Sequence, residues 1–217
     1  GSYPDILNQS ADTQILLRNL TDSYLYKDIL ATENIRKPDL LDKLLRALAY
    51  QVGSEVSYNE LAQTVGSDSK TVEKYIELLE KCFIIFRLNG LSRNLRNELK
   101  KAKKIYFYDN GIRNAVIQQF APLEMRNDVG ALWENFFISE RIKRNHYQQY
   151  YCNMYFWRTQ SQQEIDYIEE RDGMMTVFEM KWNPKKANTT IPEAFLKAYP
   201  IKETTIITPE NYLDWLL

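Results

Sequence analysis

Apolar and polar residues alternate along much of the C-terminal part of the chain, and this period of two is typical of β-strands. Apolar residues at helical spacing occur before and between these segments. The predicted elements are a helix at 131–143, strands at 154–158, 164–170 and 174–182, a helix at 192–199 and a strand at 204–208. Asp172-Gly173, between the second and third strands, is typical of a tight hairpin turn. The predicted order is therefore helix, three strands, helix, strand.

The N-terminal half shows mainly helical periodicity. The predicted elements are helices at 40–51, 57–66 and 68–80, followed by a strand at 82–88. Ser57 and Glu60 have the spacing of a capping box, and Gly66 is suited to end the helix that they begin. Three helices, two of them joined by a tight glycine turn, and a following strand predict a winged helix-turn-helix.

Composition limits the classes of protein to consider. The chain has 217 residues, of which 44% are hydrophobic and 26% charged, so it is long enough for two small cores. No apolar run has the length of a membrane span and no signal peptide opens the chain, so we expect a protein without a membrane partner. Cys82 and Cys152 are far apart and indicate reduced thiols in a cytoplasm. The single histidine, His146, argues against zinc hydrolysis.

The candidate chemistry lies on the predicted hairpin. Because side chains alternate along strands, Asp166 and Glu179 are expected on one side of the sheet, and Lys181 shares the face of Glu179. Carboxylates that converge in a mostly apolar sheet are costly unless a cation lies between them. Asp166 and Glu179, with Glu134 on the preceding helix, would then bind a divalent metal, and Lys181 would act in catalysis. The alternative is an exposed ladder of cross-strand ion pairs that includes Arg158.

Candidate nucleic-acid contacts lie in the N-terminal half. In a winged helix that binds DNA, side chains near the start of the second helix meet the bases. The candidates here are Ser69, Lys70, Glu73 and Lys74. A second basic segment, suited to phosphate contacts, contains Arg93, Arg96, Lys100 and Lys101 and continues to Lys103 and Lys104. Three glutamates on the same helix, Glu73, Glu77 and Glu80, and a formal net charge of −1 weaken the attraction to phosphate. A partner-binding module and a solvated charge run remain the alternatives.

The order of elements from residue 131 resembles the core of the PD-(D/E)XK nuclease superfamily. This resemblance implies an αβββαβ domain in which Glu134, Asp166 and the Glu179-x-Lys181 motif form a site for Mg²⁺ or Mn²⁺. The chain has Ile165 where the name of the motif places proline.

Several further motifs follow one another along the chain. They are Tyr3-Pro4-Asp5-Ile6, Tyr24-Leu25-Tyr26-Lys27-Asp28-Ile29, Lys104 to Gly111, Gly130 to Asn135, Trp157-Arg158-Thr159 and Glu164 to Tyr167. In this order they resemble the C-terminal half of bacterial and archaeal AAA-type ATPases that carry a C-terminal domain of unknown function. The resemblance implies a preceding P-loop module that binds ATP, and the 217 residues contain no Gly-x-x-x-x-Gly-Lys-Ser/Thr. We therefore expect this chain to be the part that follows the ATPase.

These observations predict an α/β (α+β) protein with three parts. Residues 3–38 form a helical lead-in, residues 39–127 a winged-helix domain with a bridging segment, and residues 128–217 a PD-(D/E)XK nuclease-like domain. The expected function is a nuclease-like, DNA-engaging region that works with the ATPase module of the same full-length chain and is able to form oligomers. The rival hypothesis is a non-catalytic module that binds a protein partner or DNA through its winged helix.

Overall fold

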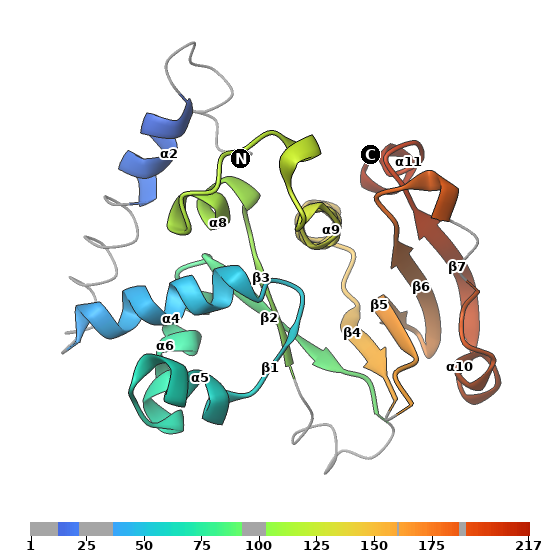
Figure 1. Ribbon diagram of the computed structural model, residues 1–217. Coiled ribbons are helices and arrows are strands. Elements are labelled where there is room, and N and C mark those ends of the chain that lie inside the picture. The colour runs from blue at the N-terminus through green and yellow to red at the C-terminus, as the bar shows by residue number, and fades with distance from the viewer. Residues whose placement is uncertain (1–12, 22–36, 93–102, 160, 187–189) are drawn as a thin grey trace. The chain divides into compact units, whose positions relative to one another are not determined.

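The computed structural model describes residues 13–21, 37–92, 103–159, 161–186 and 190–217. The protein is mixed α/β, and its strands hydrogen-bond in the order β1-β3-β2-β4-β5-β6-β7 (Figure 1). The chain divides into two compact units. Unit 1 comprises residues 1–87 and 105–126, and unit 2 comprises residues 88–104 and 127–217. Strands β2 and β3 therefore contribute residues to both units.

Unit 1 contains most of the helices of the N-terminal half. Its helices are α2 (Thr13–Leu20), α4 (Pro38–Tyr50), α5 (Tyr58–Val65), α6 (Ser69–Lys81), α8 (Asn110–Val116) and the short η2 (Leu123–Met125). The strands are β1 (Glu55–Val56), β2 (Ile85–Gly90) and β3 (Lys103–Phe107). Of the predicted lead-in at 3–38, residues 3–12 and 22–36 lie outside the described part of the chain.

Short-range polar contacts set the ends of the helices in unit 1. The Ser57 side chain accepts a hydrogen bond from the Glu60 N–H, and Asp68 caps α6 by accepting from the Thr71 N–H at 2.9 Å. Gly66 ends α5 with a φ of 69°, in the left-handed region that glycine adopts without strain. In the motif before α8, Asp109 likewise accepts from the Ile112 N–H. These caps explain why the helices begin and end near the predicted residues.

One strand of unit 1 begins later than predicted. The expected strand began at Cys82, whereas β2 begins at Ile85. The backbone N–H of Ile84 still donates to Leu79 O of the preceding helix, and Phe83 has a φ of 55°. The turn that follows α6 therefore occupies residues 82–84, which the apolar pattern assigned to the strand.

Unit 2 contains the predicted order of helix, three strands, helix and strand. Its elements are α9 (Val129–Tyr147), β4 (Asn153–Arg158), β5 (Glu164–Arg171), β6 (Met174–Met180), η3 (Pro184–Lys186), α10 (Glu193–Ala198), β7 (Ile201–Ile207) and α11 (Leu213–Leu216). Strands β4, β5 and β6 are antiparallel, whereas β7 pairs with β6 in parallel and the end of β2 pairs with β4 in parallel. Asp172 and Gly173 form the β5–β6 turn with φ values of 54° and 77°, which supports the predicted hairpin.

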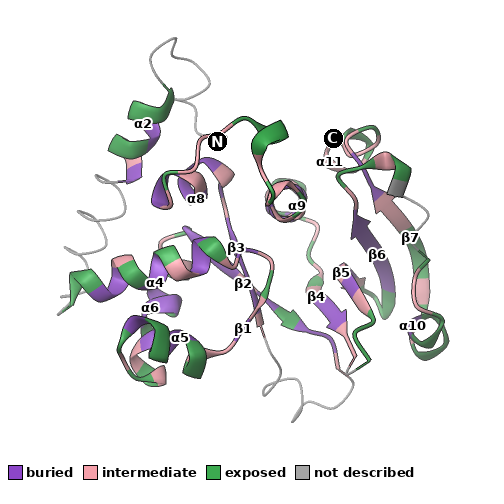
Figure 2. Cartoon of the chain, viewed as in Figure 1, coloured by how far each residue is buried: buried purple, intermediate pink, exposed green. Residues whose placement is uncertain are grey.

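The sheet of unit 2 is covered on both faces. Val177 and Phe178 are neighbours on β6, so their side chains point to opposite faces. Val177 belongs to an apolar cluster with Phe195 of α10, whereas the Phe178 ring lies 5.7 Å from Phe137 of α9 and 5.1 Å from Trp215 of α11. Strand β6 is buried along nearly its whole length (Figure 2). Any charged side chain on this strand is therefore removed from bulk water.

Candidate functional site

Strands β5 and β6 place Asp166 beside Glu179. Their antiparallel register pairs Tyr167 with Phe178, and one residue further along this register Asp166 stands opposite Glu179. The Met180 N–H donates to Asp166 Oδ2 at 2.9 Å, which holds the carboxylate against β6. Because directly opposed residues of an antiparallel pair share a face, the two carboxylates lie on the same side of the sheet.

A backbone irregularity coincides with this position. Tyr155 pairs with Ile168 and Trp157 pairs with Ile165, so Asp166 and Tyr167 of β5 stand against a single residue of β4. Such a bulge bends a strand and changes the direction of its side chains. The register shift therefore affects the direction in which the Asp166 side chain points.

Glu179 is a buried carboxylate with only half of its hydrogen bonding satisfied. The residue is 4% exposed, and its Oε2 accepts a hydrogen bond from Lys181 Nζ at 3.1 Å. Its Oε1 is buried and has no hydrogen-bond partner. Burial, followed by the negative charge of Asp166, raises the pKa of Glu179 to about 7. Burial also raises the pKa of Asp166, despite the hydrogen bond from Met180. The two carboxyl groups therefore favour a shared proton or a nearby cation.

Lys181 supplies one such cation. Burial lowers the pKa of its ammonium, but the charges of Asp166 and Glu179 raise it by more, and the net shift is upward. The charge of Glu134 on α9 acts in the same direction. The Lys181 N–H donates to Ile207 O of β7 at 2.9 Å, which fixes the backbone that carries the ammonium. Lys181 therefore stays positively charged beside the paired carboxylates.

Glu134 takes part in a second ion pair, with Lys104. The Lys104 side chain is 3% exposed, and its Nζ lies 3.3 Å from Glu134 Oε1 and 2.5 Å from Glu164 Oε1. Burial lowers the pKa of Lys104, whereas the charges of Glu134 and Glu164 raise it above its usual value. The ammonium also lies 5.4 Å from the ring centroid of Phe156. The site thus contains four acidic side chains and two lysines.

Lys104 and Glu164 belong to this site although the sequence pattern did not predict them there. Lys104 was interpreted as part of a basic run whose alternatives were a solvated segment and a phosphate contact. The one available signal was that it directly precedes Ile105-Tyr106-Phe107, an apolar run typical of a buried strand. The alternative hypothesis was an exposed ladder of cross-strand ion pairs. The predicted exposure is wrong, because Glu179 is buried. The Glu179–Lys181 ion pair of this ladder is present, and Arg158 donates to Gln162.

The acidic side chains that the structure describes at the site are not arranged as a metal centre with three or more protein ligands. Among the described residues, no three or more histidine, cysteine or carboxylate side chains are grouped so that they could hold a metal ion. Asp166 and Glu179 lie together, and Glu134 is directed to Lys104. The predicted three-carboxylate set is therefore divided between two lysines in this structure.

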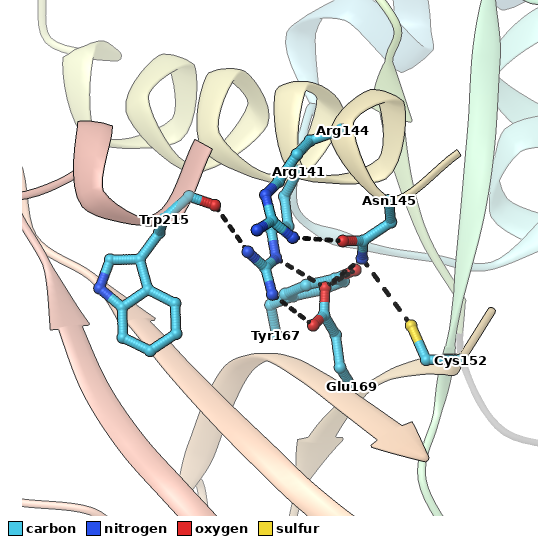
Figure 3. A network of polar contacts seen from close by, with 7 residues as sticks. All are labelled: Arg141, Arg144, Asn145, Cys152, Tyr167, Glu169 and Trp215. Carbon is cyan, nitrogen blue, oxygen red and sulfur yellow. Dashed lines mark hydrogen bonds and ion pairs between the residues drawn. The ribbon is translucent and has the colours of Figure 1, made fainter. Parts of the chain in front are cut away.

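A separate buried polar network connects α9, β5 and α11 (Figure 3). Arg141 Nε and Nη2 donate to the two carboxylate oxygens of Glu169 at 2.9 and 2.8 Å. Glu169 Oε1 also accepts from Asn145 Nδ2 at 2.5 Å and from the Tyr167 hydroxyl at 3.2 Å. Arg141 Nη1 donates to Trp215 O at 2.6 Å. These hydrogen bonds and the ion pair neutralise the charge of Glu169 and connect α11 to α9. The geometry of the network therefore indicates a role in stability.

The predicted nucleic-acid contacts of unit 1 are only partly described. Lys70 and Lys74 are exposed on α6, and Ser69 is half-buried. Glu80 was expected on the same exposed face, but its Oε1 accepts from the Arg87 N–H at 2.8 Å and it forms an ion pair with the Arg87 guanidinium. Its charge is therefore neutralised inside unit 1. The other four candidates, Arg93, Arg96, Lys100 and Lys101, lie outside the described residues.

The fold and the site define a mixed α/β protein that carries a partly buried cluster of acids and lysines. Residues 1–123 match the family described as "Domain of unknown function (DUF8612)", and the chain belongs to this family. Residues 129–215 match "Domain of unknown function (DUF4143)", a domain type associated with AAA ATPases. The two matches meet close to the start of α9.

Curated relatives share the sequence over part of its length. Uncharacterized proteins of Mycobacterium bovis and Mycobacterium tuberculosis are each 27% identical over 139 residues, which is 62% of this chain and 30% of theirs. An uncharacterized protein of Haemophilus influenzae is 24% identical over 123 residues, or 54% of this chain and 31% of its own. The aligned part of the chain thus spans about a third of the length of these relatives. No solved structure matches the chain. None of the helices in the described ranges is long and apolar enough to cross a membrane.

Proposed function

We propose that unit 2 is a nuclease-like domain of the PD-(D/E)XK type that hydrolyses phosphodiesters of DNA with the help of Mg²⁺ or Mn²⁺. In this proposal, Asp166 and Glu179 hold the metal and Lys181 acts on the attacking water or on the developing charge. Glu134 completes the site from α9. The observation that carries the proposal is the buried Oε1 of Glu179, which has no hydrogen-bond partner and belongs to a carboxylate beside Asp166.

The donor atoms fit the proposed ion. Mg²⁺ and Mn²⁺ prefer carboxylate oxygens, and both Asp166 and Glu179 supply them. A divalent cation would offset the burial and the repulsion from Asp166 that together raise the pKa of Glu179 to about 7. The bound ion would lower the pKa of a water molecule and stabilise negative charge on the phosphate.

The protein side chains have separate tasks in this scheme. Glu179 directs Oε2 to Lys181 and leaves Oε1 available as a ligand or as a proton acceptor. The hydrogen bond from the Met180 N–H to Oδ2 orients Asp166. Despite burial, the negative charges of Asp166 and Glu179 raise the pKa of Lys181, so its ammonium stays positively charged. It is then able to stabilise the charge that develops during attack on phosphorus.

Unit 1 would dock the DNA or the ATPase as a winged helix. In this proposal, α4, α5 and α6 form the three-helix core and β2 and β3 the wing, and Lys70 and Lys74 approach the duplex from α6. Both lysines are exposed, and the ion pair of Glu80 with Arg87 removes one negative charge from the helix face. Ser69 at the start of α6 would meet a base or a phosphate.

The full-length protein is proposed to be an AAA-type ATPase. The match of residues 129–215 to a domain type associated with AAA ATPases supports this proposal, as does the greater length of the curated relatives, of which the aligned part covers only 30%. ATP would then be bound by a module outside these 217 residues, and that module would be the first partner of this chain. The expected location is the bacterial cytoplasm.

The direct test is cleavage of plasmid, linear and single-stranded DNA in the presence of Mg²⁺ or Mn²⁺. The parent chain should cut at least one substrate, and Lys181→Ala should abolish cutting while the fold is kept. Lys202→Ala is the matched control because Lys202 is an exposed lysine on β7, and it should retain the parental rate. Cleavage that persists in Lys181→Ala would refute the assignment of Lys181.

The second candidate is a non-catalytic interaction module. The observation in its favour is Lys104, because an ammonium already neutralises part of the acidic cluster without a metal. On this hypothesis neither the parent chain nor any site variant cleaves DNA, and calorimetry detects no Mn²⁺ binding by the parent. Cleavage that requires a divalent metal and Lys181 would exclude it.

A further inference from the structure

Lys104 joins two acidic side chains that come from separate elements. Its side chain is 3% exposed, and its Nζ lies 3.3 Å from Glu134 Oε1 and 2.5 Å from Glu164 Oε1. Glu134 lies on α9, and Glu164 is the first residue of β5, the strand that also carries Asp166. Glu134 takes part in further interactions as well. The ammonium therefore links the helix of one predicted site residue to the strand of another.

The neighbours of Lys104 hold its ammonium at a fixed place. Lys104 belongs to β3 and directly precedes Ile105, which is buried and whose carbonyl oxygen accepts a hydrogen bond from the Gly53 N–H at 3.1 Å. The ammonium lies 5.4 Å from the ring centroid of Phe156 on β4. A side chain on a packed strand positions its partners more precisely than one on a loop. Lys104 is thus a fixed hydrogen-bond donor for Glu134 Oε1.

The contact between Lys104 and Glu134 lies close to the proposed metal ligands. Burial lowers the pKa of Lys104, whereas the charges of Glu134 and Glu164 and, to a smaller extent, that of Asp166 raise it above its usual value. The ammonium that holds Glu134 therefore also interacts with Asp166. The motif formed by Glu134, Asp166 and Glu179-x-Lys181 does not include Lys104, so the motif assigns it no role.

We propose that Lys104 is a positioning residue of the candidate site, which holds the Glu134 carboxylate in place for the hydrolysis that Asp166, Glu179 and Lys181 carry out. Lys104 touches none of the reacting atoms and acts through Glu134. The inference rests on the proposed function, because the affected reaction is the metal-dependent cleavage. A displacement of about 1 Å in a site of this kind lowers the rate about 100-fold. Loss of Lys104 should therefore reduce kcat and leave DNA binding unchanged.

The first measurement is the rate of Mn²⁺-dependent DNA cleavage by the full 217-residue chain and by Lys104→Met. We expect kcat to fall about 100-fold, while KM for DNA stays within about threefold of the parent. Calorimetry should give a Kd for Mn²⁺ within the same limit, because Asp166 and Glu179 are unchanged. Lys202→Met removes an exposed lysine of β7 and should match the parent in all three quantities.

Glu164→Gln distinguishes a positioning role from a role in stability alone. It removes the charge of the other partner of the same ammonium and keeps the contact between Lys104 and Glu134. Lys104→Met and Glu164→Gln each remove a buried ion pair, so both should lower Tm. Only Lys104→Met should lower kcat, and Glu164→Gln should stay within about threefold of the parent. Equal losses of kcat in the two variants would overturn the positioning role.

The carbon-13 resonance of the Glu134 carboxyl carbon gives a readout that needs neither metal nor cleavage. The resonance is assigned by its absence from Glu134→Gln. In the metal-free protein it should shift or broaden in Lys104→Met, because the carboxylate loses a fixed donor, and should keep its position in Glu164→Gln. An unchanged resonance in Lys104→Met would show that other contacts hold Glu134, which overturns the inference.

A second variant covers the case in which Lys104→Met does not fold. Lys104→Met/Glu164→Gln removes the ammonium together with one of its acids, so two carboxylates are not left facing each other. It should show the same fall in kcat and the same change in the Glu134 resonance. If neither Lys104 variant folds, Lys104 has a role in stability and the inference is wrong.

The outcomes separate this inference from the proposed function. Cleavage by the parent with an undiminished kcat in the Lys104 variants overturns the role of Lys104 and leaves the nuclease intact. No cleavage by the parent with either Mg²⁺ or Mn²⁺ contradicts the proposed function, and the effect of Lys104 on catalysis fails with it. The Glu134 resonance then still reports whether Lys104 holds the carboxylate.

Discussion

The unusual ionisation of Glu179 leads to a prediction about stability and pH. Burial and the neighbouring Asp166 raise the pKa of Glu179 from 4.5 to about 7 in the folded protein. The folded state therefore prefers the protonated carboxyl more strongly than the unfolded state does. Glu179→Gln substitutes a neutral side chain of nearly the same shape, which imitates the protonated form at every pH.

The sign and size follow from proton linkage. The stability that the Glu179 proton contributes is fully present below pH 4.5 and is lost as the pH rises through about 7. The difference between these two pKa values corresponds to about 3 kcal/mol in the free energy of unfolding. At pH 8 and without divalent metal, Glu179→Gln should therefore be more stable than the parent by about 2–3 kcal/mol, since loss of the ionic contact with Lys181 offsets part of the gain. Below pH 5 the two proteins should be nearly equal.

Tryptophan fluorescence is a suitable assay, because all four tryptophans, at 133, 157, 182 and 215, lie in unit 2. Urea unfolding in EDTA from pH 4.5 to 8 would give the difference between variant and parent at each pH. Glu203→Gln, at an exposed position on β7, is the control and should follow the parent. A difference between Glu179→Gln and the parent that is constant over this range would refute the reasoning. If the site binds Mn²⁺, saturating metal should reduce the difference at pH 8.

Three further predictions concern other parts of the structure. Glu169→Ala leaves the buried Arg141 guanidinium without its carboxylate and should destabilise unit 2 by about 3–5 kcal/mol in urea unfolding, whereas the exposed pair partner Glu193→Ala should cost less than about 1 kcal/mol. Gly66→Ala forces alanine into a φ of 69° and should cost about 1 kcal/mol, measured by amide hydrogen exchange in α5; an unchanged exchange rate would contradict the strain. If α6 contacts DNA phosphates, Lys70→Ala should weaken binding to all sequences alike and reduce the salt slope by about 1 in fluorescence anisotropy, and an unaltered slope would exclude this contact.

Lys104 changes the chemical interpretation of the acidic cluster. A carboxylate triad at Glu134, Asp166 and Glu179 would by itself suggest a metal centre, but Glu134 already has a buried ammonium as its partner. The contact with Glu164 adds a fourth acid that the motif does not contain. The number of metal ions bound is therefore a more informative first measurement than the rate of cleavage, because it separates an open site from a neutralised one.

Features with local causes were predictable from the sequence. The caps at Ser57, Asp68 and Gly66 and the turn at Asp172-Gly173 involve residues within about one helical turn or one hairpin of each other. Strand alternation and this turn also led to the expectation that Asp166 and Glu179 share a face, since both residues belong to one hairpin. The ends of β2 were less predictable because the apolar run 82–88 suits both a buried strand and the end of a packed helix.

The sequence alone therefore determined the order of the helices and strands and the hairpin that brings one acidic pair together, because short-range sterics, capping and periodicity control both. Tertiary structure decided which charges were paired inside the protein. Lys104 and Glu134 are 30 residues apart, and Arg141 and Glu169 are 28 apart, so neither contact has a local pattern. The energy of such pairs depends on burial and on the approach of separate elements, and these exist only in the folded chain.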